Sequence, residues 1–248
     1  MGKIIAVSSG KGGTGKTTVT AALSSCLAVP GMGYKTLALD FDAELRNLDL
    51  SLAMSDFTVM DIMDVIGGHL DLMDACSESP QIPNLSFLAA PSTSLPKDID
   101  EAAVSDMFDD IRENFDYCII DVPAGLGRGF QLAHSNVDMS IIVSTGDVAS
   151  LRDASITANR VREMGITELR LIVNRVLPKN LKKVRTTIDD MIDTVGVQLL
   201  GIAREDNNVF LAMNAHTPLI LYKKRLSAYD FLDAARRLTG SDIPTVIK

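Results

Sequence analysis

The glycine-rich stretch SSGKGGTGKTTV, at positions 8–19, contains the residues with the clearest chemical pattern in the chain. From Gly10 to Thr17 it matches the phosphate-loop pattern GxxxxGK[ST]. Glycines in such a loop let the backbone adopt a positive φ and approach phosphate oxygens closely. Lys16 can then contact the phosphates of a nucleotide, and the hydroxyl of Thr17 can bind Mg²⁺. The stretch therefore predicts a site for a nucleotide and Mg²⁺.

Carboxylates that could complete this site follow two of the apolar runs. Asp121 ends the run 117–120, and ligands collect beyond the carboxyl ends of strands in open α/β sheets. We expect Asp121 to belong to the shell of the Mg²⁺ ion. Asp40 and Asp42 close another apolar run, where a metal-orienting role and an ordinary strand-end role both stay open.

The elements that must position these residues alternate along the chain. Apolar runs predict strands at 4–8, 36–39, 85–89, 117–121, 140–144, 169–173 and 199–202. Helical periodicity predicts helices at 17–28, 99–114, 148–164 and 227–238. Most of the runs are continuously apolar, as expected for strands that are covered on both faces. The sequence thus predicts an α/β fold, a doubly wound and mostly parallel sheet with helices on both faces, in a single domain over residues 1–248.

Composition excludes several other classes of protein. The three cysteines among the 248 residues lack the spacing of a zinc site, and a reducing cytoplasm fits them. No apolar run approaches the ~18 residues that indicate a membrane span. The net charge of −8 is uneven, because residues 1–167 carry 11 basic and 23 acidic side chains while residues 168–248 carry 13 and 9. We therefore expect a cytoplasmic globular protein with an acidic first part and a mildly basic second part.

The segment KGGTGKTT, at 11–18, resembles the deviant Walker A motif KGGxGKTT of the MinD/ParA family of P-loop ATPases. The similarity continues along the whole chain, in DFDAELRNLDL at 40–50, DVPAG at 121–125, SLRD at 150–153, NR at 174–175 and ED at 205–206. The motif RNLDL favours the MinD branch of this family over plasmid-type ParA. Lys11, which an ordinary phosphate loop does not need, corresponds to the signature lysine of the family.

The resemblance implies an ATPase that hydrolyses ATP to ADP, uses Mg²⁺ and forms a homodimer when ATP is bound. Lys11 would reach the phosphates held by the other subunit, and Asp42 would position the attacking water. The implied catalytic residues are Lys11, Lys16 and Asp42, and the implied metal residues are Thr17, Asp40 and Asp121. The implied nucleotide-binding residues are Gly10, Lys11, Gly12, Gly13, Thr14, Gly15, Lys16, Thr17, Thr18, Asn174, Arg175, Glu205 and Asp206.

The resemblance also implies a cellular role, a switch in division-site placement or similar spatial positioning. A protein activator or a division inhibitor would then bind the helix over residues 150–160, from Ser150 to Arg160. A pilus- or flagellum-positioning relative of MinD is an alternative that the sequence barely separates from this one. A ParA-like partitioning ATPase could contact DNA through the basic runs 179–185 and 223–225, but a pI near 4.9 argues against nucleic-acid binding. A metallocluster carrier is a further alternative, which cysteines in separate segments do not favour.

The chain departs from the family pattern in four places, one of which is the turn over residues 28–35, about two residues longer than usual. Val122 occupies the position of a Ser or Thr, and Arg204 the position of a Pro. MinD proteins generally end in a short amphipathic helix that binds the membrane, whereas this chain ends TGSDIPTVIK. Pro244 opposes a helix there, and a single lysine gives little attraction to anionic lipid. The sequence therefore leaves peripheral attachment at the inner face of the cell membrane open.

Overall fold

A computed structural model describes residues 1–92, 99–181, 186–223 and 226–245 of the chain. Parts of the basic runs 179–185 and 223–225 lie outside these described residues, as do the last three residues of the chain.

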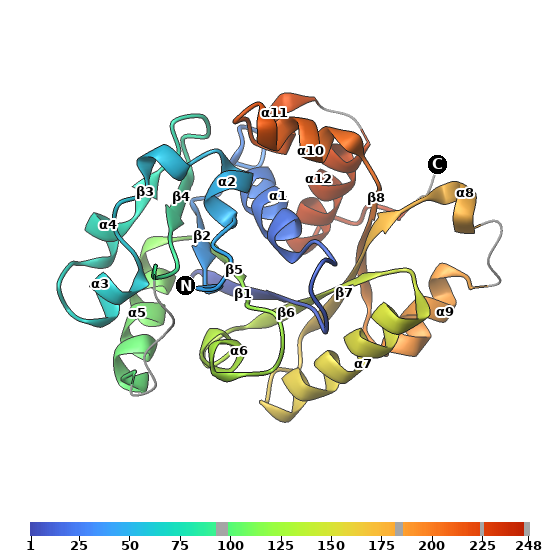
Figure 1. Cartoon of the computed structure of the whole chain (residues 1–248), viewed down its shortest axis with the longest axis horizontal. Helices are drawn as coiled ribbons and strands as arrows, with labels where there is room; N and C mark the ends of the chain where they lie inside the picture. The colour runs from blue at the N-terminus through green and yellow to red at the C-terminus, as the bar shows by residue number, and fades with distance from the viewer. Residues whose placement is uncertain (93–98, 182–185, 224–225, 246–248) are drawn as a thin grey trace.

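One sheet of eight strands organises the fold (Figure 1). Its order is β3-β4-β2-β5-β1-β6-β7-β8, and all neighbours are parallel except β3 and β4. The strands are β1 (Lys3–Ser8), β2 (Thr36–Asp40), β3 (Ser77–Glu78), β4 (Leu85–Leu88), β5 (Tyr117–Asp121), β6 (Met139–Thr145), β7 (Leu169–Val176) and β8 (Leu199–Arg204). The expected doubly wound, mostly parallel α/β sheet is confirmed. The sequence missed β3, because two polar residues carry no strand pattern.

Helices cover both faces of the sheet, as Figure 1 shows. One face carries α1 (Lys16–Ala28), α2 (Leu48–Leu52), α10 (Asn207–Asn214), α11 (Leu219–Tyr222) and α12 (Ser227–Leu238). The other carries α3 (Ile62–Ile66), α4 (Leu72–Ala75), α5 (Glu101–Asn114), α6 (Arg128–Ala133), α7 (Val148–Glu163) and α9 (Ile188–Val195). A short α8 (Pro178–Leu181) follows β7, and a 3-10 turn, Ser55–Phe57, follows α2.

The two faces bury two separate hydrophobic cores. Along β1, Ile4 and Ala6 pack into the core beneath α5 and α7, while Ile5 and Val7 pack into the core beneath α1 and α12. Successive side chains of a strand point to opposite faces, so a strand buried on both sides needs apolar residues at every position. This requirement explains the continuous apolar runs in the sequence.

Strand β1 lies inside the sheet, with β2 to β5 on one side of it and β6 to β8 on the other. Strand β1 lies between β5 and β6, and the phosphate loop, residues 9–15, leaves its carboxyl end. Parallel strands that diverge from such a point leave a crevice at their carboxyl ends, which is the usual ligand site of this architecture. The fold thus places the phosphate loop where a ligand is expected.

Residues 241–245 lie against the end of α12. Residues 241–245 form no helix, and Arg237 of α12 donates to the backbone carbonyls of Ile243 and Pro244. Within the described residues, no helix combines the length and the apolar character needed to cross a membrane.

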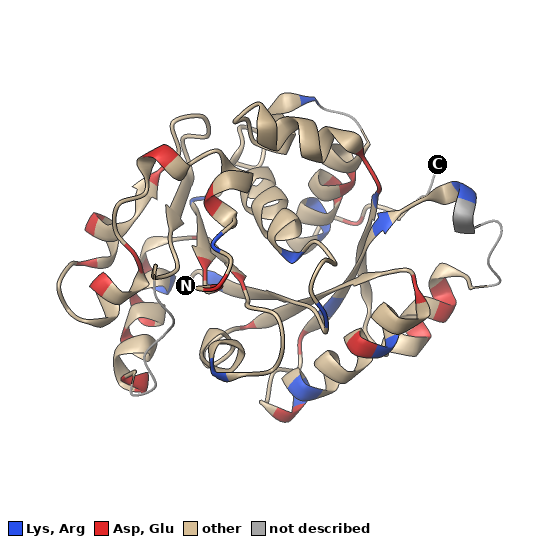
Figure 2. Cartoon of the chain, in the orientation of Figure 1, with Lys and Arg blue, Asp and Glu red and all other residues tan. Residues whose placement is uncertain are grey.

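Charged positions are unevenly distributed over the molecule (Figure 2). Acidic positions predominate over α3, α4 and α5, whereas α7, β7, β8 and α12 together carry several basic positions. The uneven charge of the sequence is therefore also uneven in space.

Candidate active site at the phosphate loop

The glycines of the phosphate loop are required by its conformation and by its neighbours. Gly13 and Gly15 have φ angles of 83° and 92°, which side-chain-bearing residues rarely adopt. A Cβ on Gly15 would collide with the side-chain amide of Asn174, and a Cβ on Gly10 would collide with the backbone of Asp153 in α7. The backbone of the loop therefore packs closely against β7 and α7, with no room for a side chain at Gly10 or Gly15.

The loop offers hydrogen-bonding capacity that the described residues do not use. The Gly15 cap of α1 provides no side-chain bond, and the first turn of α1 has no acidic residue. The hydroxyl of Thr14 is buried without a partner among the residues described, and open space lies beside Gly12 and Gly13. Free N–H groups at a helix start favour an anion. These residues fit the phosphates of a nucleotide.

The first residues of α1 meet the carboxylate at the end of β5. Lys16 is only 8% exposed, and its charge acts on Asp121. The Thr17 hydroxyl donates to Oδ2 of Asp121 at 2.6 Å, and the Thr20 hydroxyl lies 3.5 Å from its Oδ1. Three sequence-predicted residues of the site, Lys16, Thr17 and Asp121, thus lie together.

Asp40 and Asp121 are register partners at the ends of the adjacent strands β2 and β5. Burial raises the pKa of Asp40 to about 8, and the neighbouring Asp121 acts in the same direction. Burial also raises the pKa of Asp121 to about 6, against the hydrogen bond from Thr17. A nearby cation relieves such a penalty on two carboxylates, so the pair fits Mg²⁺.

The described residues contain no group of three or more His, Cys, Asp or Glu side chains that could hold a metal. A Mg²⁺ ion at Thr17, Asp40 and Asp121 would therefore take most of its ligands from phosphates and water, as Mg²⁺ commonly does at nucleotide sites.

Asp42 joins the same acidic cluster from the loop after β2. Its backbone N–H donates to Oδ1 of Asp40 at 2.8 Å, and its own Oδ1 accepts from the backbone N–H groups of Glu44 and Leu45, each at 3.2 Å. Asp42 is 8% exposed. The turn therefore holds this carboxylate in place close to Asp40, at the carboxyl edge of the sheet.

Lys11 takes a different direction from Lys16. Its ammonium donates to Oδ1 of Asp147 at 3.2 Å, and its side chain is 38% exposed. Asp147 also caps α7 by accepting from the backbone N–H of Ser150 at 3.0 Å. Hydrogen bonds from Thr145, Ser150 and Lys11 lower the pKa of Asp147 to about 2. Lys11 is thus held at the start of α7, away from the phosphate cradle formed by its own loop.

A pocket of about 410 Å³ opens beside the phosphate loop and gathers the remaining predicted residues. We call it the base pocket. Its lining comprises Gly13, Gly15, Thr18, Asn174, Arg175, Arg204, Glu205, Asp206, Asn207, Val209, Phe210, Met213, Ser227 and Phe231. Its size and its mixture of apolar and polar side chains suit a nucleoside.

The walls of the base pocket are fixed by polar contacts. The amide of Asn174 donates to the backbone carbonyl of Thr14 at 2.9 Å, which ties β7 to the phosphate loop. Arg175 and Glu205 form an ion pair at 2.8 Å. Asp206 caps α10 by accepting from the backbone N–H of Asn208 at 2.9 Å. The four base-side residues of the sequence prediction therefore lie together and beside the loop.

Three contributors to the site were not singled out from the sequence. Asp147 stands directly before α7, and an N-cap pattern could have found it. Thr20 lies one helical turn beyond Thr17 and so faces the same carboxylate. Asp230 in α12 bonds Arg204 across 26 positions of the chain, and no local pattern signals such a contact.

His134 lies buried behind the phosphate loop, and the sequence assigned it no role. Its Nε2 lies 3.0 Å from the hydroxyl of Ser8 and 3.3 Å from that of Ser140, and its Nδ1 lies 2.8 Å from the carbonyl oxygen of Phe130. Burial lowers the pKa of His134 to about 4. A neutral imidazole therefore joins the end of α6 to the last residue of β1.

Comparison with known proteins agrees with this geometry. A family model described as "AAA domain" matches residues 2–172. The septum site-determining protein MinD of Synechocystis sp. is 35% identical over 246 residues, which cover 98% of this chain and 92% of that protein.

Two solved structures extend the likeness to three dimensions. The MinC:MinD cell division protein complex of Aquifex aeolicus matches with a TM-score of 0.91 and 32% identity, covering 99% of this chain and 98% of that one. The septum site-determining protein MinD of Pyrococcus horikoshii, complexed with Mg-ADP, matches with a TM-score of 0.82 and 29% identity, covering 98% of this chain and all of that one.

The fold and the phosphate loop define a P-loop ATPase of the deviant Walker A class. Lys11, the feature that separates this class from other P-loop proteins, is present and lies outside its own phosphate cradle. The chain belongs to the MinD family of septum site-determining proteins. The sequence-based assignment to this family is confirmed.

Proposed function

We propose that this chain is an ATP-driven dimerising switch of MinD type that acts in division-site placement. It hydrolyses ATP to ADP and uses Mg²⁺. The observation that carries the proposal is the contrast between the two lysines of the phosphate loop. Lys16 is buried beside Asp121, whereas Lys11 is partly exposed and points to the start of α7. A cation held at the molecular surface suits a role toward a second subunit.

The residues around the nucleotide have separate proposed roles. When bound, ATP supplies the phosphoryl group, and Mg²⁺ neutralises part of its charge. Lys16 and the backbone N–H groups of the phosphate loop hold the phosphates, and Asp42 positions the attacking water. Thr17, Asp40 and Asp121 hold the shell of the metal. The nucleotide contacts are completed by Gly10, Gly12, Gly13, Thr14, Gly15, Thr18, Asn174, Arg175, Glu205 and Asp206.

Homodimer formation is part of the proposal. Lys11 leaves Asp147 and reaches the phosphates held by the partner subunit, where its charge stabilises the negative charge of the reacting phosphoryl group. ATP thereby favours the dimer, and hydrolysis removes the phosphoryl group that holds it together. The whole chain, residues 1–248, acts as one ATPase domain, which the single sheet and its two cores support.

A protein partner binds α7 in this proposal. Arg152, Ile156 and Asn159 lie three or four positions apart on the exposed face of α7, and Ile156 is 51% exposed. The Aquifex MinD relative forms a complex with MinC. By analogy, we place a division inhibitor or an activator of this chain on residues 150–160.

The proposed location is the cytoplasm, with peripheral attachment at the inner face of the cell membrane left to a direct test. Co-sedimentation with vesicles of anionic and neutral lipid, with ATP or ADP, measures this attachment. Sedimentation only with ATP and anionic lipid would indicate a dimer-dependent membrane site.

The test of the switch uses Asp42→Ala to slow hydrolysis. With Mg-ATP, light scattering should report a mass of twice the monomer for this variant. Adding Lys11→Ala should return the mass to that of the monomer, while nucleotide binding by the monomer partly persists. Lys35→Ala, which removes an exposed lysine at the amino end of β2, serves as the matched control and should still dimerise. A Lys11→Ala protein that dimerises with ATP would overturn the proposal.

A further inference from the structure

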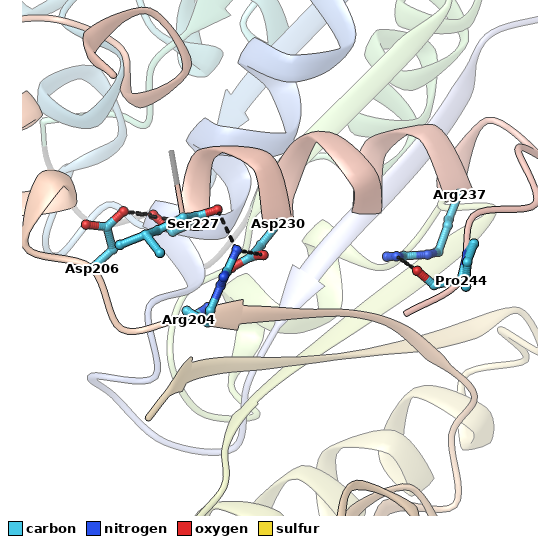
Figure 3. Close-up of polar contacts among 7 residues, drawn as sticks. Arg204, Asp206, Ser227, Asp230, Arg237 and Pro244 are labelled. Carbon is cyan, nitrogen blue, oxygen red and sulfur yellow. Dashed lines mark hydrogen bonds and ion pairs between the residues drawn. The ribbon is translucent and has the colours of Figure 1, made fainter. Parts of the chain in front are cut away.

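Helix α12 is joined to the end of β8 by a paired set of charged groups (Figure 3). Arg204 donates through Nε to Oδ2 of Asp230 at 2.9 Å and through Nη2 to Oδ1 at 2.7 Å. The backbone N–H of Arg204 also donates to Oδ2 of Asp230 at 3.0 Å. The side chains are 23% and 14% exposed. This is a bidentate, largely buried ion pair, whose two parallel hydrogen bonds fix its geometry and whose loss on one side would leave a buried charge unpaired.

One partner of the ion pair belongs to the wall of the base pocket. Arg204 itself lines that pocket, and the next two residues are Glu205 and Asp206. Figure 3 shows a second link beside it, in which the hydroxyl of Ser227 donates to Oδ2 of Asp206 at 2.8 Å. Two side-chain contacts from the first turn of α12 therefore hold the segment between β8 and α10.

The pair controls where the Arg204 guanidinium lies. Bound to Asp230, and through Nη2 to the carbonyl oxygen of Leu226 at 3.3 Å, the guanidinium is held toward α12. Without that anchor, its long side chain would be free to enter the pocket that it lines, and the carboxylate of Asp230 would keep only the backbone N–H of Arg204 among these contacts. Arg204 lines the pocket and Glu205 is the next residue, so the anchor bears on the pocket wall at both positions.

We propose that Arg204 is a positioning residue for nucleotide binding, which sets the wall of the base pocket through its ion pair with Asp230. The inference rests on the proposed function, because it assumes that a nucleoside occupies this pocket. Arg204 acts on the base and sugar side of the nucleotide and has no part in binding the phosphates.

The same helix supplies a matched control. Arg237, near the other end of α12, donates to the backbone carbonyls of Leu200, Ile243 and Pro244 at 3.0, 2.7 and 3.1 Å. Like Arg204, it holds α12 against β8 through several hydrogen bonds, but it does not line the base pocket. A loss of general stability of α12 should therefore follow from either substitution, whereas a loss of pocket shape should follow only at Arg204.

The experiment measures ATP hydrolysis by the full chain for Arg204→Gln, Arg204→Lys and Arg237→Gln. Arg204→Gln should raise the KM for ATP about tenfold and change kcat less than about twofold, because the lost contact positions the base and not the reacting atoms. Arg204→Lys, which keeps the charge but not the bidentate geometry, should fall between this variant and the unchanged protein. Arg237→Gln should leave both constants unchanged, even where it lowers Tm.

Competition by inorganic triphosphate separates the phosphate side from the base side. Its inhibition constant should be the same for the unchanged protein and Arg204→Gln, because triphosphate does not enter the base pocket. Equal KM values for Arg204→Gln and the unchanged protein would overturn the inference, as would equal rises for Arg204→Gln and Arg237→Gln. If the unchanged protein neither hydrolyses ATP nor binds triphosphate, the proposed function itself fails.

Discussion

Lys11 and Lys16 lie five positions apart in one loop, and their surroundings differ in kind. Lys16 is buried at the start of α1 beside the carboxylate of Asp121. Lys11 stands at the surface, ion-paired with Asp147 at 3.2 Å. Exposed ion pairs of this type contribute little stability, so another cationic or anionic partner can replace this one at low cost. The ion pair with Asp147 is thus compatible with a change of partner, in which Lys11 leaves Asp147 and contacts a second subunit.

His134 gives a second observation at the scale of single residues, with a consequence for stability. Its imidazole is neutral in the folded protein down to about pH 4, whereas an unfolded chain takes up the proton near pH 6.5. The unfolded state binds more protons between these values, so the free energy of unfolding falls as the pH is lowered through this window.

We predict that the free energy of unfolding of the protein falls by about 1–2 kcal/mol more than that of His134→Gln between pH 7 and pH 5. Glutamine removes the titrating group and retains a donor and an acceptor for Phe130 and Ser8. Chemical unfolding followed by circular dichroism at several pH values provides the measurement. Parallel pH profiles for the two proteins would contradict the prediction.

At the scale of the elements, helix α7 begins at the residue that holds Lys11. Asp147 is at once the N-cap of α7 and the ion-pair partner of the signature lysine. The cap contact needs only a side-chain oxygen, whereas the ion pair needs a negative charge. Substitutions can therefore separate the two contributions.

Asp147→Ala should lower the free energy of unfolding by about 1 kcal/mol, because it removes the cap of α7. Asp147→Asn keeps an acceptor oxygen and should stay within about 0.5 kcal/mol of the unchanged protein, since the exposed ion pair adds little. Urea unfolding of both variants without nucleotide measures the difference. Equal losses for Ala and Asn would assign the contribution to the ion pair and refute the role of the cap.

Most strands and the four longest helices, α1, α5, α7 and α12, could be predicted because their patterns are local, whereas the shorter helices were missed. The residues of β5, Tyr117–Asp121, were identified in full, since a strand buried on both faces is a continuous apolar run. Strand β7 was predicted to end at 173 but continues to Val176, because the polar Asn174 and the exposed Arg175 interrupt the apolar pattern. Those two residues line the base pocket, so the pattern fails where the strand serves the site.

Like the elements of the fold, some residues of the site could be predicted from local patterns and others could not. The phosphate loop and Asp121 follow from motifs and from the rule for carboxyl ends of strands. The partners Asp147 and Asp230 did not follow, because each meets its basic partner only after the chain has folded back from a distant position. Sequence spacing gives the phosphate loop and Asp121, and tertiary contacts give the partners that hold Lys11 and Arg204.

At the scale of the whole molecule, the charge of the chain bears on its partners. The net charge is −8, and the acidic excess of residues 1–167 outweighs the basic excess of residues 168–248. A protein that binds DNA without sequence preference needs a positive surface to displace counterions from the phosphates. The overall field of this molecule repels DNA instead.

We accordingly expect no binding of non-specific duplex DNA by Asp42→Ala protein with Mg-ATP at about 0.15 M salt. Electrophoretic mobility shifts and fluorescence anisotropy with a labelled duplex measure this, with ADP in place of ATP as the control. Binding that appears with ATP and weakens steeply as salt is raised would contradict the expectation and would favour a ParA-like role.

The contact between Gly10 and the backbone of Asp153 has a mechanical consequence. The Gly10 backbone lies directly against the main chain and the Cβ of Asp153, so no long side chain separates the loop from the helix. We therefore expect a shift of the loop at this point to displace α7 as well. A protein bound to α7 would then respond to the position of the phosphate loop through this direct contact, without a relay of intervening residues.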